Sequence, residues 1–204
     1  MRLVDMTICD FSDEVDSNSP APGGGSVSAL AGNIGVGLAR MMAHLSFGKK
    51  KYENLDENIR VEFLNRFNQL ADIRQELVYL VDKDTESFNE VMKAIRLPKD
   101  TKEQIEYRNK AIQDATLFSI NIPFKTAKEC LKALNIIGYI LEYGNQNALM
   151  LYTGVEGAVL NVKVNLSSLD NKELKKYYED ECKNILNKAS LIKDNILSTV
   201  HNNI

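Results

Sequence analysis

The feature that most constrains the fold of this sequence is a run from Leu55 to Ile95 in which apolar residues recur at helical spacing, with no Pro or Gly to interrupt them. A single helix of this length would be about 60 Å long, which is unusual for a globular domain. The run therefore predicts either one long helix of an elongated bundle or two helices with a break between them. Leu97 and Pro98 end the pattern, because proline disrupts a helix interior.

Apolar spacing predicts helices in most of the remaining chain as well. Thr7 is expected to cap a short helix that runs to Val15. Pro123 lies inside one helical pattern and is expected to kink or split it. The other expected helices are 26–46, 101–133, 134–143 (closed by Gly144), 148–162 and 171–202. No clear alternating strand occurs, so we predict one domain over residues 1–204 with an all-α fold, an elongated bundle of long antiparallel helices.

Three consecutive glycines follow a proline and precede the helix expected from Ser26, in the order Pro22, Gly23, Gly24, Gly25 and Ser26. Glycine adopts positive φ without steric cost, and Ser26 is a favourable N-cap residue. A Gly-rich loop that leads into a helix N-terminus predicts an anion site, because free N–H groups and the helix dipole converge there. The alternative is a flexible turn. The spacing is that of neither a dinucleotide fingerprint nor a P-loop, which argues against nucleotide binding.

The helix after this loop contains many small residues, among them Gly32, Gly35 and Gly37. Glycine inside a helix costs about 1 kcal/mol relative to alanine. The cost predicts a compensating close approach by another helix, a ligand or a second subunit. A poorly formed, frayed helix is the alternative, although the apolar stripe of this segment is intact.

Bulk properties exclude several classes of protein. A net charge of −3 and a pI of about 5.5 argue against a protein that binds nucleic acid through phosphate neutralisation. No stretch is long and apolar enough to span a membrane, and no signal peptide is recognised. Cys9, Cys130 and Cys182 are too far apart for a metal knuckle and fit a reducing cytoplasm. With only His44 and His201 besides, no metal site is expected.

Two aspartates in the long helical run are candidates for chemistry. Asp82 and Asp84 are two residues apart, so they point about 200° apart on a helix. Asp84 falls on the side that carries Phe88 and Val91. A carboxylate on an apolar face is costly unless it is paired or used, and its pKa tends to rise. Asp84 is therefore the better candidate for a general acid or base, and a solvated helix-face acid is the alternative.

Basic and amide side chains supply further candidates. The run Lys49, Lys50 and Lys51 could attract an anionic substrate, or it could be a solvated loop. Four asparagines near expected helix ends could hydrogen-bond a heterocycle or cap a helix: Asn145, Asn147, Asn161 and Asn165.

Taken in order, these motifs resemble a known family. They are Pro22–Ser26, Gly48–Tyr52, the Asp82-x-Asp84-x-x-x-Phe88 pattern, Arg96–Lys99, Gly144-Asn145, and the segment from Gly157 to Leu166 with Asn161 and Asn165. Each motif is weak alone, but the ordered set is specific and spans nearly the whole chain. It resembles the cyclodeaminase/cyclohydrolase family of folate enzymes, which includes the cyclodeaminase half of formiminotransferase-cyclodeaminase and stand-alone bacterial methenyltetrahydrofolate cyclohydrolases.

The resemblance implies an all-helical homodimer that binds folate near the subunit interface and uses no metal or redox cofactor. In the family the second aspartate of the Asp-x-Asp pair is catalytic, which implies that role for Asp84. The Gly-rich helix start or the lysine run would hold the carboxylates of a folate glutamate tail, which can be polyglutamylated. The expected substrate-binding residues are Gly23, Gly24, Gly25, Ser26, Lys49, Lys50, Lys51, Asp82, Asn145, Asn147, Asn161 and Asn165.

The sequence departs from the family pattern at one point. The family has a Ser-x-Ser-Asp-like segment after its Gly-Asn motif, whereas here Asn147 runs directly into Ala148, Leu149 and Met150. About eight residues are missing relative to that pattern, either as a true deletion or as a flexible loop omitted from the sequence. A true deletion would remove part of the pocket wall.

The resemblance and the length together predict hydrolysis of 5,10-methenyltetrahydrofolate to 10-formyltetrahydrofolate by a stand-alone cytoplasmic enzyme. The methenyl bridge is an amidinium cation, so an adjacent carboxylate can stabilise its charge and move protons. The alternative enzyme is a formiminotetrahydrofolate cyclodeaminase, which releases ammonia. A rival of another class is a non-catalytic folate-binding helical dimer that has lost the Ser-x-Ser-Asp segment.

Overall fold

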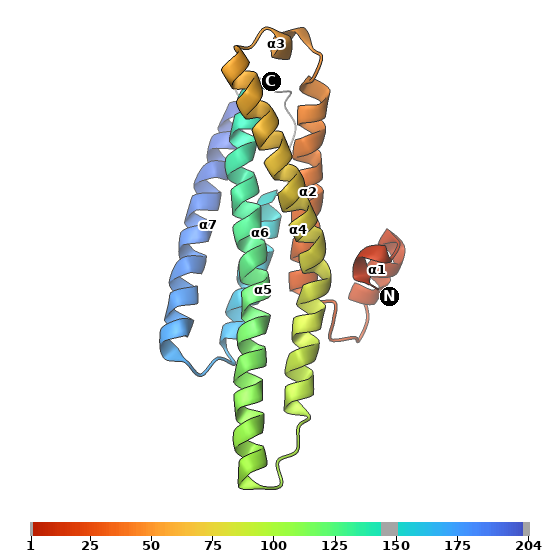
Figure 1. The fold of residues 1–204 in the computed structure, drawn as a ribbon, viewed down its shortest axis with the longest axis vertical. Helices are drawn as coiled ribbons and strands as arrows, with labels where there is room; N and C mark the ends of the chain where they lie inside the picture. Colours follow the sequence, from red (N-terminus) through yellow and green to blue (C-terminus); the bar gives the residue numbers. More distant parts are fainter. Residues whose placement is uncertain (1, 144–150, 202–204) are drawn as a thin grey trace.

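A computed structural model describes residues 2–143 and 151–201, and its regular elements within those ranges are all helical (Figure 1). The prediction of an all-α fold is confirmed. In chain order the elements are the 3₁₀ turn η1 (Leu3–Asp5), α1 (Ile8–Val15), α2 (Gly24–Ser46), α3 (Lys50–Glu53), α4 (Glu57–Ile95), α5 (Lys102–Tyr143), α6 (Leu151–Leu166) and α7 (Lys172–His201). Across the described ranges, no helix has the length and apolarity to cross a membrane.

The long apolar run forms the single helix α4, so the one-helix alternative holds. The predicted break between Ala133 and Leu134 is wrong, because α5 is one helix of 42 residues. Leu134 and Ile137 are both almost fully buried, and neither Gly nor Pro stands at this point to end the helix. Helices α4 and α5 lie side by side along the length of the molecule (Figure 1).

Pro123 does not split α5, although the sequence predicted a kink or a break. Proline has no N–H, so the carbonyl of Ser119, four residues earlier, loses its helical donor. The side chain of Asn165 replaces that donor, since its Nδ2 donates to Ser119 O at 2.8 Å. A side chain from α6 thus satisfies the carbonyl that Pro123 leaves unpaired in α5.

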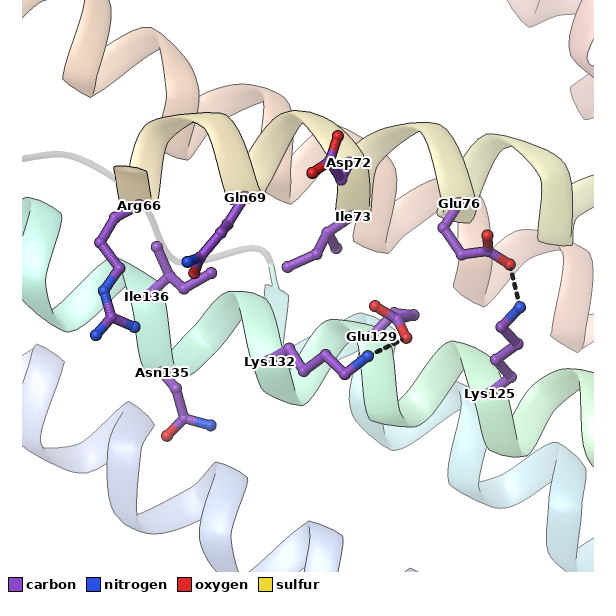
Figure 2. Close-up of a pocket in the computed structure, with 10 residues that line it drawn as sticks. All are labelled: Arg66, Gln69, Asp72, Ile73, Glu76, Lys125, Glu129, Lys132, Asn135 and Ile136. Atoms are coloured by element: carbon purple, nitrogen blue, oxygen red, sulfur yellow. Dashed lines mark hydrogen bonds and ion pairs between the residues drawn. The ribbon is translucent and has the colours of Figure 1, made fainter. Parts of the chain in front are cut away.

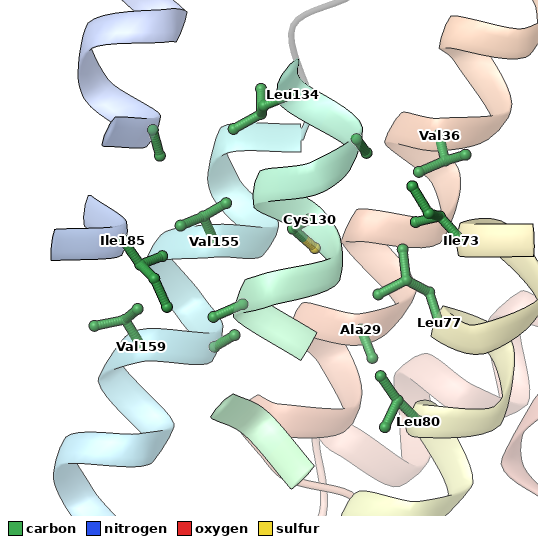
Figure 3. Close-up of a cluster of buried hydrophobic side chains, with 14 of the residues drawn as sticks. Ala29, Val36, Ile73, Leu77, Leu80, Cys130, Leu134, Val155, Val159 and Ile185 are labelled. Atoms are coloured by element: carbon green, nitrogen blue, oxygen red, sulfur yellow. The ribbon is translucent and has the colours of Figure 1, made fainter. Parts of the chain in front are cut away.

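The hydrophobic core lies between α2, α4, α5 and α6, and α7 packs on the outside of α5 and α6. Figure 3 shows Ala29 of α2 with Leu77 and Leu80 of α4, and Val155 of α6 with Ile185 of α7. The largest fully buried side chains are Val36, Met42, Phe63, Leu70, Leu77, Leu80, Val81, Ile120, Ile137, Ile140 and Leu166. They come from four helices, so the core depends on the arrangement of the whole bundle.

Small residues allow α2 and α6 to approach closely, as the glycine content of α2 predicted. A Cβ atom on Gly154 would lie 3.1 Å from the Cα of Gly32, and one on Gly157 would overlap Ser28 Oγ. A Cβ on Gly24 would lie 2.7 Å from Asn161 Nδ2. We call the α2–α6 contact through Gly24, Ser28 and Gly32 the glycine seam. It fixes the N-terminus of α2 against α6.

Gly32→Ala is expected to destabilise the protein, because the new Cβ would lie 2.5 Å from Cys130 Sγ at a fully buried site. The overpacking should cost about 1–3 kcal/mol in the free energy of unfolding, measured by chemical denaturation. Gly138→Ala on α5 is the matched control, since its Cβ would meet nothing within 4 Å. It should stabilise the protein by up to about 1 kcal/mol through helix propensity. Equal effects of the two substitutions would contradict the close packing at Gly32.

Candidate active site

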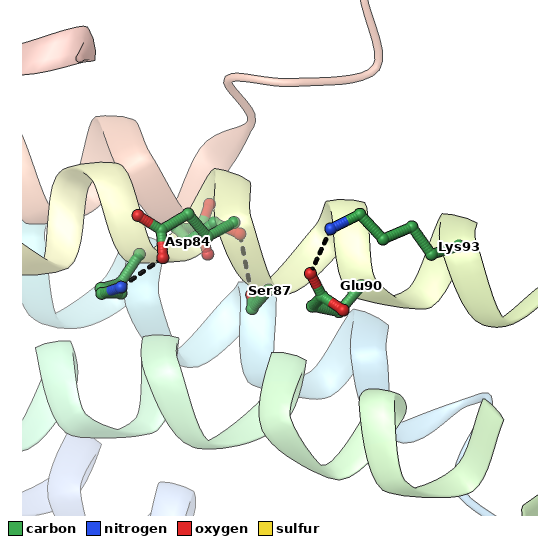
Figure 4. Close-up of polar contacts among 6 residues, drawn as sticks. Asp84, Ser87, Glu90 and Lys93 are labelled. Carbon is green, nitrogen blue, oxygen red and sulfur yellow. Dashed lines mark hydrogen bonds and ion pairs between the residues drawn. The ribbon is translucent and has the colours of Figure 1, made fainter. Parts of the chain in front are cut away.

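Asp84 of α4 contacts the first turn of α2 (Figure 4). Its Oδ2 accepts a hydrogen bond from the backbone N–H of Ser26 at 2.8 Å. The hydroxyl of Ser26 lies 3.2 Å from the same oxygen and 2.9 Å from Val81 O, and Ser26 is fully buried. Two helices that are far apart in the sequence are therefore joined through one carboxylate.

This contact corrects the predicted start of α2. The helix begins at Gly24 with Gly23 as N-cap, so Ser26 is its third residue and not its cap. The N–H groups of a first helical turn have no partner inside the helix, and the carboxylate of Asp84 accepts one of them. The Gly-rich loop was expected to hold a ligand anion, whereas the anion found there is the side chain of Asp84 itself.

Gly25 is required by the closeness of this contact. A Cβ atom on Gly25 would overlap the carboxylate of Asp84, so any larger residue would push the two helices apart. The Gly-rich segment therefore works here through the absence of a side chain, and none of its described glycines has a positive φ.

Burial raises the pKa of Asp84, and the two hydrogen bonds from Ser26 oppose that rise only in part. Among the ion pairs that the described residues form, none includes Asp84. Its charge is thus stabilised by neutral donors at a helix N-terminus and not by a cation. A carboxylate in this state can accept or release a proton at a pH above the ordinary aspartate range, and it attracts a cationic ligand.

Asp84 lines a cavity of about 370 Å³. The cavity walls come from the loop before α2, from α4, from α5, and from α6 with the turn after it. The described lining residues are Pro20, Ala21, Gly23, Asp84, Thr85, Ser87, Phe88, Val91, Thr116, Ser119, Asn161, Val164, Asn165, Ser167 and Ser168. They combine one carboxylate with hydroxyl, amide and apolar groups, and none of them is Lys or Arg.

Several residues predicted for the site meet at this cavity. Gly23, Asp84, Asn161 and Asn165 line it, although they are far apart in the sequence. Gly24 lies against Asn161, and Gly25 and Ser26 lie against Asp84, so the whole Gly-rich segment adjoins the cavity. The amide of Asn161 donates to Gly157 O at 2.8 Å, and that of Asn165 donates to Ser119 O, so both amides also hold the walls in place.

Other predicted residues lie elsewhere. Asp82 is not among the cavity-lining residues, because its Oδ1 accepts from the N–H of Leu3 at 2.6 Å and anchors η1. The two aspartates therefore hold different segments, as their opposite helix faces predicted. Asn145 and Asn147, the expected helix end at Gly144 and the shortened segment after Asn147 fall outside the described residues.

The lysines Lys49, Lys50 and Lys51 lie at the far end of α2 from the cavity (Figure 1). Helix α2 has 23 residues and is therefore about 35 Å long. A single chain does not bring these lysines to the Gly-rich segment, so within one protomer the two alternatives for holding the glutamate tail are separate places.

The sequence did not point to the hydroxyl groups of the cavity. Thr85 and Ser87 on α4, and Thr116 and Ser119 on α5, line it together. Hydroxyl residues are common in helices, and nothing in their spacing distinguishes these four. Only the packing of α4 against α5 shows that they share a cavity.

A second, larger groove of about 650 Å³ runs between α4 and α5 (Figure 2). Four of its charged side chains form two ion pairs: Lys125 contacts Glu76 at 2.5 Å and Lys132 contacts Glu129 at 2.6 Å. Asp72, which also lines the groove and forms no ion pair among the described residues, is exposed, whereas Asp84 is partly buried and its pKa is raised by that burial. We therefore place the candidate active site at the smaller cavity, despite the difference in volume. In the part of the chain that the structure describes, no cluster of His, Cys, Asp and Glu could hold a metal ion.

Comparison with known proteins identifies the family. The family model described as formiminotransferase-cyclodeaminase matches residues 7–184. The chain belongs to this family. It is 31% identical over 206 residues to the methenyltetrahydrofolate cyclohydrolase of Methylorubrum extorquens, with 97% of each chain covered. The predicted resemblance is thus confirmed.

Two further relatives complete the comparison. The chain is 30% identical over 195 residues to the formimidoyltransferase-cyclodeaminase of Rattus norvegicus, covering 92% of this chain and 35% of that protein. It therefore spans about a third of that longer relative. The crystal structure of formiminotetrahydrofolate cyclodeaminase from Thermotoga maritima has the same fold, with a TM-score of 0.77, 22% identity and 97% of each chain covered.

Asn165→Leu is expected to lower the free energy of unfolding by about 1–3 kcal/mol, because it leaves Ser119 O without a donor. In a Pro123→Ala background the loss should be smaller, since the backbone N–H of residue 123 can then pair with that carbonyl. Denaturation of the two single variants and the double variant measures this coupling.

Asn135→Leu is the control for this double-mutant cycle of Asn165→Leu and Pro123→Ala. Asn135 Nδ2 donates to Leu131 O, which does not depend on Pro123. Its effect should be the same in both backgrounds. Additive effects of Asn165→Leu and Pro123→Ala would contradict the assigned role of Asn165.

Proposed function

We propose that this protein hydrolyses 5,10-methenyltetrahydrofolate to 10-formyltetrahydrofolate, with Asp84 as the catalytic residue. The observation that carries the proposal is a partly buried carboxylate without a cationic partner in a cavity whose described lining has no Lys or Arg. The methenyl bridge of the substrate is an amidinium cation, so it supplies the positive charge that the described lining of the cavity lacks.

One carboxylate is sufficient for the proton transfers of this reaction. As water adds to the methenyl carbon, Asp84 accepts a proton from it and the amidinium charge is lost. Asp84 then returns that proton to N5 while the bond between the carbon and N5 breaks. The remaining hydroxyl proton passes to solvent as the formyl C=O forms on N10. A raised pKa suits a group that must both take up and release a proton near neutral pH.

The alternative reaction is cyclisation of 5-formiminotetrahydrofolate with release of ammonia. Here N10 attacks the formimino carbon, and an acid must protonate the departing nitrogen, which Asp84 with its raised pKa could do. The fold neighbour from Thermotoga maritima, named for this activity, supports it. Hydrolysis is preferred because the relative named a cyclohydrolase is 31% identical along 97% of both chains, whereas the fold neighbour is 22% identical.

Two assays on the purified protein separate these reactions. Hydrolysis predicts loss of the near-ultraviolet absorbance of 5,10-methenyltetrahydrofolate, and cyclodeamination predicts ammonia from 5-formiminotetrahydrofolate. Turnover of 5-formiminotetrahydrofolate alone would make cyclodeamination, and not hydrolysis, the preferred function. Binding of tetrahydrofolate without turnover of either substrate would support the non-catalytic folate-binding dimer.

Asp84→Asn is expected to lower kcat by about 100-fold or more, because an amide can neither accept the proton nor offset the amidinium charge. The fold should persist, since the amide oxygen can still accept from the N–H of Ser26. Steady-state kinetics and circular dichroism test both parts. A folded variant with unchanged kcat would exclude Asp84 as the catalytic group.

The raised pKa of Asp84 also determines how the stability and the activity of the protein change with pH. Folded Asp84 keeps its proton to a higher pH than the unfolded chain does, so its ionisation lowers stability as the pH rises from the ordinary aspartate pKa through the raised one. Asp84→Asn should therefore gain stability relative to the unsubstituted protein across that range. The acid limb of the kcat/KM profile should lie above the ordinary aspartate pKa. If Asp84→Asn instead lost stability relative to the unsubstituted protein as the pH rose through this range, the raised pKa would be contradicted.

We further propose a cytoplasmic homodimer without a metal or redox cofactor. Helix α2 supports the dimer, because Val27, Ile34, Met41 and Leu45 are all exposed on one face of it. These side chains recur at intervals of seven and four residues, which align on a helix. The cysteines at positions 130 and 182 are buried and free, which fits a reducing compartment.

A dimer would also give Lys49, Lys50 and Lys51 a role. If the α2 helices of two subunits pack antiparallel about a two-fold axis near their middle, the lysines of one subunit approach the Gly-rich segment of the other. They would then hold the glutamate tail of the folate, which a single chain does not allow.

Ile34→Glu should convert the dimer to a monomer in sedimentation experiments, since it places a charge in the apolar stripe of α2. The monomer should also lose any preference for polyglutamylated over monoglutamylated substrate. Leu191→Glu on α7, where the side chain is 64% exposed, is the control and should remain dimeric. A monomeric unsubstituted protein at micromolar concentration would overturn the dimer.

A further inference from the structure

Thr116 of α5 lines the same cavity as Asp84 and is only 2% exposed. Its Oγ1 is buried and has no hydrogen-bond partner among the described residues. A buried hydroxyl without a partner loses its bonds to water and gains nothing in return, so it lowers the stability of the ligand-free protein.

The other hydroxyls on the α4 and α5 walls of the cavity all have partners among the described residues. Thr85 Oγ1 lies 3.3 Å from Ser26 Oγ. Ser87 Oγ donates to Asp84 O at 2.7 Å (Figure 4), and Ser119 Oγ donates to Thr116 O at 2.8 Å. Thr116 is thus the buried hydroxyl of these walls whose hydrogen bonds are unused.

The rest of α5 shows that this state is not imposed by the helix. Thr126 is also almost fully buried, and its Oγ1 donates to Ile122 O, four residues earlier, at 3.2 Å. A buried threonine of α5 can therefore satisfy its hydroxyl within the helix. Thr116 does not do so, and its hydroxyl has no other partner among the described residues.

We infer that Thr116 Oγ1 hydrogen-bonds the folate substrate and is a further substrate-binding residue of the site. The inference rests on the proposed folate reaction. A hydroxyl can both donate and accept a hydrogen bond, so it can pair with a nitrogen or a carbonyl oxygen of the ligand. Asp84 acts on the cationic bridge, whereas Thr116 holds another polar atom. Phe88 and Val91, which line the same cavity, supply apolar contacts for the rings.

The two roles predict different kinetic effects. Loss of Asp84 removes the proton transfers and lowers kcat. Loss of the Thr116 hydroxyl removes a bond that exists in both the bound substrate and the transition state, so it raises KM more than it lowers kcat.

Thr116→Val is the decisive variant, because it replaces the hydroxyl with a methyl group of similar shape. Without ligand its melting temperature should equal or exceed that of the unsubstituted protein, since an unpaired polar group has been removed. Its KM for 5,10-methenyltetrahydrofolate and its Kd for tetrahydrofolate, measured by calorimetry, should rise about tenfold, as expected for one lost hydrogen bond. Thr116→Ser should bind within about threefold of the unsubstituted protein because it keeps the hydroxyl.

Thr126→Val is the matched control on the same helix. It removes a hydroxyl that is bonded to Ile122 O and does not line the cavity, so it should lower the melting temperature and leave KM unchanged. Thr116→Val with a lowered melting temperature and unchanged Kd would show a structural role and overturn the inference. Absence of tetrahydrofolate binding and of turnover by the unsubstituted protein would instead overturn the proposed function itself.

Discussion

The contact between the Asp84 carboxylate and the first turn of α2 is the interaction on which the site depends. It joins α4 to α2, gives the N–H of Ser26 its acceptor and places a charged group at the cavity wall. The contact is possible only because Gly25 has no side chain, since a Cβ there would overlap the carboxylate. One steric condition thus sets both the packing of two helices and the position of the proposed catalytic group.

Two further contacts position the cavity walls opposite Asp84. One is the glycine seam, and the other is the hydrogen bond from Asn165 to Ser119 O, which replaces the helical bond lost at Pro123. Gly24 and Gly32 let α6 approach α2, which brings Asn161 beside the Gly-rich segment. Asn165 then reaches α5 and bonds the carbonyl that Pro123 leaves unpaired. Of the α6 residues that line the cavity, Asn165 is therefore held by a backbone carbonyl of α5, and Asn161 by the carbonyl of Gly157 in its own helix. A rigid wall of this kind limits the entropy lost when a ligand binds.

The cavity keeps two groups in states that are unfavourable without a ligand. Asp84 is a carboxylate whose pKa is raised by burial and which forms no ion pair with the residues that the structure describes. Thr116 carries a buried hydroxyl without a partner in the part of the chain that the structure describes. A cationic ring system with neutral polar atoms would relieve both, so the binding free energy of such a ligand includes the cost already present in the free protein. The nearly complete hydrogen bonding of the neighbouring hydroxyls makes this contrast specific to these two groups.

The sequence alone determined what is local. Helical spacing predicted that residues 55–95 are helical, as one long helix or two, the Asp82/Asp84 separation predicted opposite faces, and the glycines of α2 predicted a close neighbour. Only the tertiary structure decided which groups meet. In the folded protein Asp84 accepts from Ser26, and Asn165 donates to the carbonyl of Ser119 that Pro123 leaves unpaired. Thr116 lines the cavity, whereas the lysines of residues 49–51 lie far from the Gly-rich segment. The physical reason is that periodicity fixes the face of a residue, whereas a cavity formed by segments between residues 20 and 168 depends on how four helices pack.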